Sequence, residues 1–255
     1  MELFNAMTQR RTHRGEFRAD AISQADLDQL IEAARWAPSP FNTQPWELLI
    51  IREAEGRNAV AELTVRSIVE QFKEPRFLDD NSRWMRLTDA EWRARGDGVL
   101  LTDHVDLPAT LQKDPRKLKP LLKNAKYLSV LGHFGAGKLP AKEIGELVRT
   151  SPLLILVLMD QTRRPPGEGG QRWMWLGMGA MIQNLLLAAT ELRIGTQFVS
   201  APLERHEDRQ QIRKVFNIPN SHEVITLLRL GYVDVVNRTS VRLSPSAFVR
   251  YENYT

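Results

Sequence analysis

Cysteine is absent from all 255 residues. Its absence excludes a disulfide framework, a thiolate zinc site and a cysteine nucleophile, so we expect neither thiol chemistry nor a metal site. Long apolar runs are missing too, because the richest stretch, Leu176 to Leu192, is broken by Gln183, Asn184 and Glu191. No segment is therefore expected to span a bilayer. The first twenty residues lack the apolar core of a secretory signal, and we expect a cytoplasmic protein.

A recognisable nucleic-acid-binding module is also missing. Lys and Arg outnumber Asp and Glu by 35 to 31, and this basic balance favours an anionic ligand. The main basic cluster, Lys113 to Lys126, is interrupted by Asp114, Pro115 and Pro120, and no helix-turn-helix or RNP pattern accompanies it. We interpret this cluster as a solvated face and expect no nucleic-acid partner.

Hydrophobic spacing predicts alternating helices and strands. Ser23 is a predicted N-cap for an amphipathic helix that runs to about Trp36, and the run Trp46 to Ile51 predicts a buried strand. The aliphatic run Leu153 to Met159 predicts a central strand. Further helices are expected at 57–72, 171–192 and 208–216, and further strands at 196–199 and 224–233. This pattern predicts an α+β fold, or α/β as the alternative, with a mixed sheet packed by helices.

Two regions are harder to interpret. Residues 73–142 are rich in charge, Pro and Gly and predict an irregular or helical insertion in a single domain of residues 1–255. Four aromatic residues in this region either cover a ligand or pack against the core, and the sequence leaves both alternatives open: Trp84, Trp92, Tyr127 and Phe134. The tail 235–255 carries apolar residues without a core of its own, so it needs a surface, and a second subunit is one candidate.

Three segments carry residues suited to ligand binding. Gln9 to Arg14 gathers cations and a hydroxyl that could grip a phosphate, although a plain basic surface turn is the stronger reading for this segment alone. Ala37 to Trp46 is fixed by three prolines and displays amides that suit the edge of a flat heterocycle, or else it is an ordinary connection. Small residues from Gly177 to Ala180 and from Gly195 to Pro202 allow close backbone approach, for a ligand or for tight packing.

Taken together, these segments resemble one family. The resemblance rests on three runs: Gln-Arg-Arg-Thr-His-Arg at 9–14, Ala-Pro-Ser-Pro-Phe-Asn-Thr-Gln-Pro-Trp at 37–46 and Gly-Ala-Met-Ile-Gln-Asn-Leu-Leu-Leu-Ala-Ala at 179–189. This combination is similar to the nitroreductase family of FMN enzymes. It covers about residues 5–55 and 150–245, and the middle third does not match. The resemblance implies a three-layer sandwich and an intertwined homodimer with two FMN sites at the subunit interface.

The resemblance also assigns roles by position. The FMN phosphate and ribityl chain would be served by Arg10, Arg11, Thr12 and Arg14, and the ring by a loop of the other subunit with Pro38, Ser39, Pro40, Asn42 and Gln44. The strand exit Phe198, Val199, Ser200 and Ala201 would lie along the ring, with a backbone N–H near its N5 atom. Arg242, or less strongly Arg238, would close on the phosphate. The family's usual Asn and Lys before the central strand have no counterpart that can be located.

The implied activity is a ping-pong electron transfer. NADH or NADPH would give hydride to FMN, and a nitroaromatic, quinone or flavin acceptor would then take it, with no catalytic side chain required. Two alternatives stay open: a specialised flavin dehydrogenase or dehalogenase of the same fold, and a regulatory protein that binds FMN without turnover.

Overall fold

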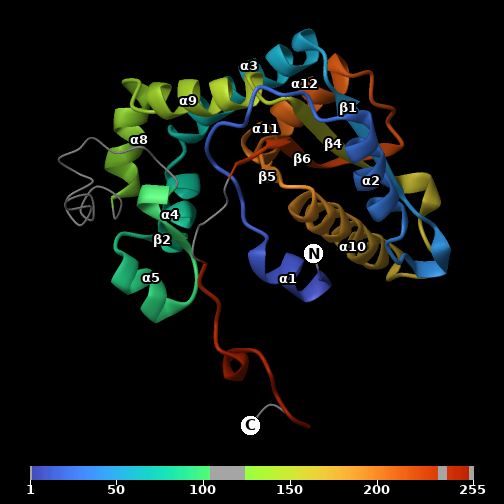
Figure 1. The fold of residues 1–255 in the computed structure, drawn as a ribbon. Helices are drawn as coiled ribbons and strands as arrows, with labels where there is room; N and C mark the ends of the chain where they lie inside the picture. Colours follow the sequence, from blue (N-terminus) through green and yellow to red (C-terminus); the bar gives the residue numbers. More distant parts are fainter. Residues whose placement is uncertain (1, 104–123, 235–239, 253–255) are drawn as a thin grey trace. The chain divides into compact units, whose positions relative to one another are not determined.

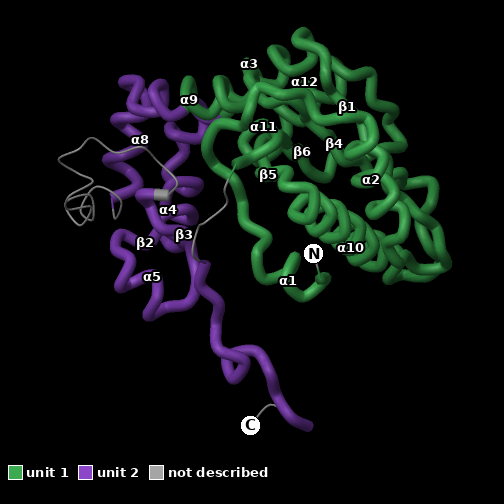
Figure 2. Tube along the Cα trace, viewed as in Figure 1, with its two compact units in different colours: residues 1–67, 141–237 green, residues 68–140, 238–255 purple. Residues whose placement is uncertain are grey.

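The computed structural model describes residues 2–103, 124–234 and 240–252, and Figure 1 traces its helices and strands. The chain divides into two compact units, coloured separately in Figure 2. Unit 1 comprises Met1–Ser67 and Ala141–Asn237, and unit 2 comprises Ile68–Pro140 and Arg238–Thr255. The single domain expected from the sequence stays a prediction. Among the described residues, no helix has both the length and the apolar character needed to cross a membrane.

Unit 1 is built on a four-stranded sheet. In spatial order its strands are β1 (Trp46–Ile51), β4 (Leu153–Asp160), β6 (His222–Tyr232) and β5 (Ile194–Phe198). Every neighbouring pair is antiparallel, so the prediction of a mixed sheet is wrong for these strands. The reason is physical: a strand covered by helices on both faces is continuously apolar, which is a pattern more typical of parallel sheets.

The central position predicted for the most aliphatic strand is confirmed. All residues of β4 are buried, and they alternate between two cores, with Leu153 and Ile155 in the first and Leu154 and Leu156 in the second. β1 has the predicted bounds, but it is an edge strand and only Ile51 is fully buried. The expectation of a buried strand there is wrong, because an edge strand has a neighbour on one side only.

The first core lies between the sheet and two helices, α2 (Gln24–Arg35) and α10 (Gly170–Glu191). Both match the predicted helices to within one residue at each end. The predicted N-cap is confirmed, since Ser23 Oγ accepts a hydrogen bond from Asp26 N at 3.1 Å. Asn184 Nδ2 of α10 donates to the carbonyl of Ala33 in α2 at 3.2 Å, so this amide joins the two helices.

The opposite face of the sheet is covered by α12 (His206–Val215) and by the unit 1 portions of α3 (Ala54–Gln71) and α9 (Lys138–Arg149). Helices on both faces give three layers, and the predicted α+β three-layer arrangement is confirmed for this unit. α3 and α12 match predicted helices to within three residues. The short helices α1 (Leu3–Gln9) and α11 (Ala201–Glu204) were not predicted, nor was the part of α9 beyond residue 142.

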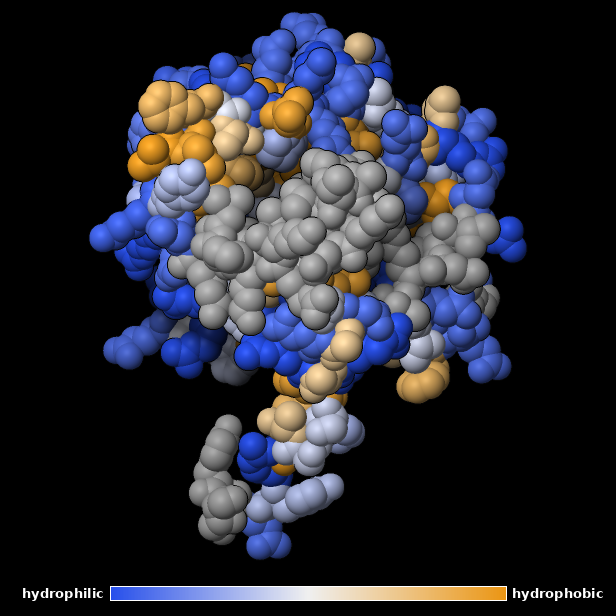
Figure 3. Space-filling view, turned by 90° about the vertical axis from the view of Figure 1, so that its left-hand side faces the viewer, coloured by the Kyte–Doolittle hydropathy of each residue, from blue (hydrophilic) through white to orange (hydrophobic). Residues whose placement is uncertain are grey.

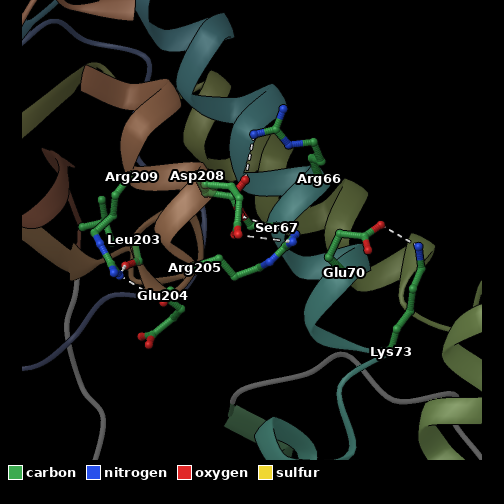
Figure 4. Close-up of polar contacts among 10 residues, drawn as sticks. Arg66, Ser67, Glu70, Lys73, Leu203, Glu204, Arg205, Asp208 and Arg209 are labelled. Atoms are coloured by element: carbon green, nitrogen blue, oxygen red, sulfur yellow. Dashed lines mark hydrogen bonds and ion pairs between the residues drawn. The ribbon is translucent and has the colours of Figure 1, made fainter. Parts of the chain in front are cut away.

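A buried carboxylate ties α12 to α3 (Figure 4). Asp208 is 1% exposed and accepts hydrogen bonds from Ser67 Oγ at 2.5 Å and Arg66 Nη2 at 2.7 Å. Arg205 Nη1 lies 3.8 Å from Asp208 Oδ2. A buried carboxylate is costly unless donors surround it, and here three side chains do so.

Unit 2 is mainly helical where it is described. It contains α4 (Pro75–Trp84), α5 (Asp89–Arg95) and α8 (Ala125–His133), and its two short strands, β2 (Met85–Arg86) and β3 (Val99–Leu100), pair in parallel. These elements lie within residues 73–142, and the insertion that the sequence predicts there stays a prediction. Residues 104–123, with most of the basic cluster, lie outside the described residues.

The four aromatic residues of this insertion differ in burial. Trp92 is 7% exposed, and its Nε1 donates to Gly98 O at 3.1 Å, whereas Trp84, Tyr127 and Phe134 are 60%, 54% and 85% exposed. On the face seen in Figure 3, the most hydrophobic side chains gather mainly at the upper left. The packing interpretation therefore holds for Trp92, and the covering role of the other three stays a prediction.

We expect Trp92→Phe to lower the free energy of unfolding by about 1–2 kcal/mol, because it removes a buried hydrogen bond and leaves Gly98 O unpaired. In the matched variant Phe134→Ser, the change should stay within about 0.5 kcal/mol, as for other exposed positions. Urea unfolding followed by tryptophan fluorescence and circular dichroism measures both. Equal stability of the two variants would contradict the assignment of Trp92 to packing.

Candidate functional site

The basic segment predicted to hold phosphate lies along the edge of the unit 1 sheet. After α1 ends, the chain runs beside β5, where Thr12 forms a parallel bridge with Thr196 and His13 N donates to Thr196 O at 2.9 Å. We call residues 10–17 the N-terminal arm. Arg10, Arg11, Thr12 and Arg14 thus stand on a segment fixed by backbone hydrogen bonds rather than on a loose surface turn.

Two glycines form the floor beneath this arm. A Cβ atom at Gly231 would lie 2.5 Å from the side chain of Phe17, and one at Gly195 would lie 3.0 Å from both His13 and Phe17. A Cβ atom at Gly231 would clash with Phe17, and one at Gly195 would press on the arm, so the arm approaches the sheet closely because both positions lack a side chain. The small residues noted at the strand exit therefore serve close packing at Gly195.

A buried arginine locks the arm in place. Arg229 of β6 is 1% exposed and donates hydrogen bonds to Gly15 O at 2.7 Å, His13 O at 3.2 Å and the side-chain oxygen of Gln197. Its guanidinium lies 4.5 Å over the Phe17 ring. No carboxylate of the described residues pairs with it, and burial lowers the pKa of Arg229 to about 10. It therefore remains a cation at neutral pH, directly beneath the arm.

Sequence reasoning missed Arg229. The signal was an arginine within a mostly aliphatic run, Ile225 to Leu230, because a charged side chain is rarely buried without partners. Within the arm itself, Arg11 Nη1 donates to the carbonyls of Thr8 and Arg10 at 2.7 Å, so Arg11 helps to close the end of α1. The arrangement presents several cationic donors and a hydroxyl on a rigid edge, which suits a phosphate group.

The proline-rich loop has a strained backbone. Phe41, Asn42 and Gln44 have φ values of 52°, 51° and 45°, in the left-handed region that side chains other than glycine rarely adopt. Ser39 holds this shape, because its Oγ accepts from Gln44 N at 2.9 Å and its carbonyl accepts from Asn42 N at 3.0 Å. Thr43 Oγ1 is buried and has no hydrogen-bond partner in the described chain. Strain of this kind is often retained at ligand sites.

The same loop rests on α10. A Cβ atom at Gly177 would lie 3.3 Å from Ser39 Cβ and 3.6 Å from Pro38 O, so the small residue allows the loop to approach the helix. Outside the neighbouring turns of α10, no atom of the described residues lies within 4 Å of the Cβ position of Gly179. Of the loop residues predicted to contact a ring, Pro38 and Asn42 are exposed, and Ser39, Pro40 and Gln44 are half-buried.

The exit of β5 is only partly available for binding. Val199 is in the second core and its N–H donates to Leu227 O at 2.9 Å, so neither its side chain nor its N–H faces a ligand. Phe198 is 44% exposed and Ala201 is half-buried. The exposed Ser200 is different: its N–H donates to no other described group.

The predicted late arginine lies in unit 2. Arg242 Nη1 donates to Ser240 Oγ and to Val241 O, and the Arg242 carbonyl lies 2.8 Å from the Cβ position of Gly96, at the end of α5. Gly96 has a φ of 69°, which suits a helix C-terminus. The weaker alternative, Arg238, lies outside the described residues, and the phosphate role of Arg242 stays a prediction.

The structure brings the arm and the β5 exit together but leaves the loop elsewhere. The arm lines β5, and the loop leads into β1, at the opposite edge of the same sheet. The two edge strands are three strand spacings apart, which corresponds to about 14 Å. Within one chain, the predicted phosphate and ring contacts are therefore separated by the width of the sheet.

Comparison with known proteins adds independent findings. A family model described as "Nitroreductase family" matches residues 7–232. The Bacillus subtilis (strain 168) protein YdgI, named as an NAD(P)H nitroreductase, is 36% identical over 62 residues, which are 24% of this chain and 30% of that protein. The matched part thus spans less than a third of this relative.

Three of the solved structures that are similar to this one have different names. Nitroreductase A of Vibrio parahaemolyticus RIMD 2210633 has a TM-score of 0.61 at 14% identity, covering 100% of this chain and 78% of that one. An iodotyrosine deiodinase bound to FMN and 3-iodo-L-tyrosine has a TM-score of 0.60 at 18% identity, covering 99% and 100%. A Parabacteroides distasonis ATCC 8503 protein, named as an NADH dehydrogenase/NAD(P)H nitroreductase, has a TM-score of 0.58 at 15% identity, covering 99% and 98%. At these identities the likeness concerns the fold.

Proposed function

Because the chain belongs to the nitroreductase family, we propose that it is an enzyme that holds FMN without a covalent bond and passes electrons from NADH or NADPH to a small organic acceptor. The observation that carries this proposal is the N-terminal arm, whose cationic residues are fixed on the sheet edge by Arg229 and by the glycine floor. A rigid set of donors loses little entropy on binding an anion, and FMN carries a phosphate dianion.

The residues present fit the parts of this cofactor. The arm would bind the phosphate through Arg10, Thr12 and Arg14, while Arg11 is partly engaged at the end of α1. At the β5 exit, Ser200 would supply the predicted backbone N–H, since the N–H of Val199 is already used. The strained loop would place the amides of Asn42 and Gln44 at the polar edge of the ring.

We propose that one FMN site is built from two copies of this chain. The arm and the loop lie at opposite edges of one sheet, so a loop from a second copy can meet the arm without spanning that distance. A surface for such a copy exists on unit 1, where α1 packs against α10 and both expose large apolar side chains, namely Leu3, Phe4, Met7, Trp173, Trp175 and Leu176. Exposed apolar groups of this size commonly mark an interface.

The chain's contribution to the reaction is placement. Bound FMN supplies hydride acceptance and donation. The arm holds the phosphate, the β5 exit offers an N–H donor, and the loop orients the ring, so no side chain of the predicted set needs to act as an acid, a base or a nucleophile. Quinones, nitroaromatics and flavins are the acceptors proposed. The dehydrogenase and dehalogenase alternatives, the regulatory alternative and the cytoplasmic location stay predictions.

The deciding experiment is an absorption spectrum of the purified full-length protein, followed by mass analysis of the released cofactor. The protein should be yellow and release FMN, and NADH or NADPH should bleach it without oxygen, with the colour returning on addition of a quinone. Colour that neither donor bleaches would favour the regulatory alternative. A colourless protein that does not take up added FMN would refute the proposal.

Arg10→Ala is expected to weaken FMN binding by roughly 10- to 150-fold, since a charge-assisted hydrogen bond to the phosphate contributes about 1.5–3 kcal/mol. Flavin fluorescence titration of the apoprotein measures the dissociation constant. Arg35→Ala, which removes an exposed arginine of α2, is the matched control and should bind FMN as the parent does. If Arg10→Ala binds FMN with unchanged affinity, the assignment of the arm to the phosphate site is wrong.

Light scattering at micromolar concentration is expected to give the mass of a dimer. Leu176→Glu should shift it toward the monomer and release FMN in parallel, because a charge placed in an apolar interface is strongly unfavourable. Val215→Glu, at an exposed apolar position of α12, should change neither property. A monomeric parent that retains FMN would refute the two-copy site while leaving the FMN proposal intact.

A further inference from the structure

Three strands bring two carboxylates and an imidazole together at one end of the unit 1 sheet. Glu47 is the second residue of β1, Asp160 the last of β4 and His222 the first of β6. Asp160 pairs directly with His222, and Glu47 pairs with Leu158, two residues before Asp160. Alternation along the strands places all three on the sheet face that carries the second core. We call them the carboxylate–histidine cluster.

The atoms of this cluster are close enough to share one ion. One potential ligand atom from each residue lies within 4.8 Å of the other two. His222 Nε2 is 3.0 Å from Glu47 Oε1, yet this nitrogen is buried and makes no hydrogen bond, so the contact lacks hydrogen-bond geometry. Two ligands on one zinc ion, each about 2.1 Å from the metal, are themselves about 3.0–3.4 Å apart. The 3.0 Å spacing is therefore compatible with neighbouring ligands of one ion, and the missing hydrogen bond within the described chain leaves Nε2 available to a metal.

Neighbouring polar groups form hydrogen bonds to the side chains of the cluster, as they commonly do around metal ligands. His222 Nδ1 lies 3.0 Å from Ser221 Oγ, so the other ring nitrogen has a partner that leaves Nε2 to face the carboxylates. Asp160 Oδ1 accepts hydrogen bonds from Thr162 N at 2.9 Å and Thr162 Oγ1 at 2.7 Å. Partners of this kind orient the ring of a ligating histidine and the carboxylate of a ligating aspartate.

We propose that Glu47, Asp160 and His222 bind one divalent transition-metal ion of the zinc class, with water completing its coordination. An imidazole together with carboxylates suits zinc and its neighbours better than magnesium or calcium, which prefer oxygen ligands alone. The lack of cysteine, which led us to expect no metal site, excludes only thiolate ligands. Arg163 Nε lies 3.3 Å from Asp160 Oδ2, and because this arginine is 54% exposed it can turn into solvent when the ion binds.

A plain ionic alternative has to be separated from this proposal. A protonated His222 between Glu47 and Asp160 would need no metal, and it would leave the cluster as an ion-pair triad. The two cases differ in one measurable respect: only a metal site takes up an ion in a fixed ratio and loses that uptake when any of its ligands is changed.

The test uses the full-length protein as purified, treated with EDTA and dialysed, and titrated with zinc chloride by isothermal calorimetry. We expect one ion per chain, and affinity at least tenfold weaker in His222→Asn and in Asp160→Asn. Glu223→Gln is the matched control, because this carboxylate follows His222 on the same strand but accepts a hydrogen bond from Gln161. Its affinity should equal that of the parent.

Anomalous diffraction at the zinc edge from crystals soaked in zinc chloride provides a second measurement that needs no variant. A peak within bonding distance of all three side chains supports the site, even if a variant fails to fold. No stoichiometric binding, equal binding in His222→Asn, or a peak elsewhere would overturn the proposal and leave the ion-pair triad.

Discussion

Replacing Arg229 by methionine is expected to lower the free energy of unfolding by about 3–5 kcal/mol. The change removes hydrogen bonds to Gly15 O, His13 O and Gln197, and each buried acceptor left without a donor costs about 1–3 kcal/mol. The methionine side chain fills part of the space but donates nothing. The melting temperature should fall by roughly 10 °C, as expected for a chain of this length.

The matched control is Arg18→Met, which removes an arginine that is half exposed and pairs with Asp20 at 2.8 Å. Exposed ion pairs contribute little, so this variant should melt close to the parent. If Arg229 holds the arm in place, Arg229→Met should also lose FMN at temperatures well below its melting transition. Normal FMN affinity in a folded Arg229→Met protein would show that phosphate binding does not depend on anchoring of the arm by Arg229. Unchanged stability would refute the locking role of Arg229.

Asp208→Ala is expected to cost about 2–4 kcal/mol of stability. The hydroxyl of Ser67 is fully buried and would lose its acceptor, and the positive charges of Arg66 and Arg205 would face each other without a carboxylate between them. The two arginines are 49% and 33% exposed, so solvent screens much of the charge effect. Most of the loss should therefore come from the unpaired hydroxyl.

Two further variants test whether the loss of stability in Asp208→Ala comes from the buried contact. Glu207→Ala changes the neighbouring, largely exposed carboxylate and should alter stability by less than about 0.5 kcal/mol. In the double variant Asp208→Ala, Ser67→Ala the buried hydroxyl is absent, so part of the lost stability should return. Urea unfolding measures all three. A double variant less stable than Asp208→Ala would show that Ser67 is not the group left unpaired.

Sequence patterns predicted the elements of unit 1 well because its hydrophobic periodicity is strong. The bounds of α2, α10 and β1 follow from Ser23, from the apolar stripe of α10 and from the run that begins at Trp46. The direction of the strands could not be read, because the apolar pattern of β4 reports burial on both faces and not the orientation of its neighbours. Short helices such as α1 carry too few turns for a periodic signal.

The candidate site, too, could be predicted from the sequence only in part. Local composition identified the arm and the proline-rich loop, since both are continuous in sequence. The carboxylate–histidine cluster could not be found this way, because Glu47, Asp160 and His222 are far apart in the sequence. Arg229 carries a local signal, but its role depends on Gln197 and on the arm, which local patterns do not connect to it. The wide separation of arm and loop likewise depends on strand order, which local patterns do not specify.

The strand order of this sheet also constrains how the chain can fold while it is being synthesised. β4 lies between β1, made more than one hundred residues earlier, and β6, whose first residue follows the end of β4 by about sixty. At ribosomal rates of about 5–20 residues per second, β4 waits roughly 3–12 s for that neighbour. During this time the run Leu153–Met159 has one unpaired edge, which is the kind of segment that associates with other nascent chains. The arm waits longer still, because its buried anchor, Arg229, is made more than two hundred residues after it. We therefore expect production of this protein to depend more on chaperones during translation than its final stability would suggest.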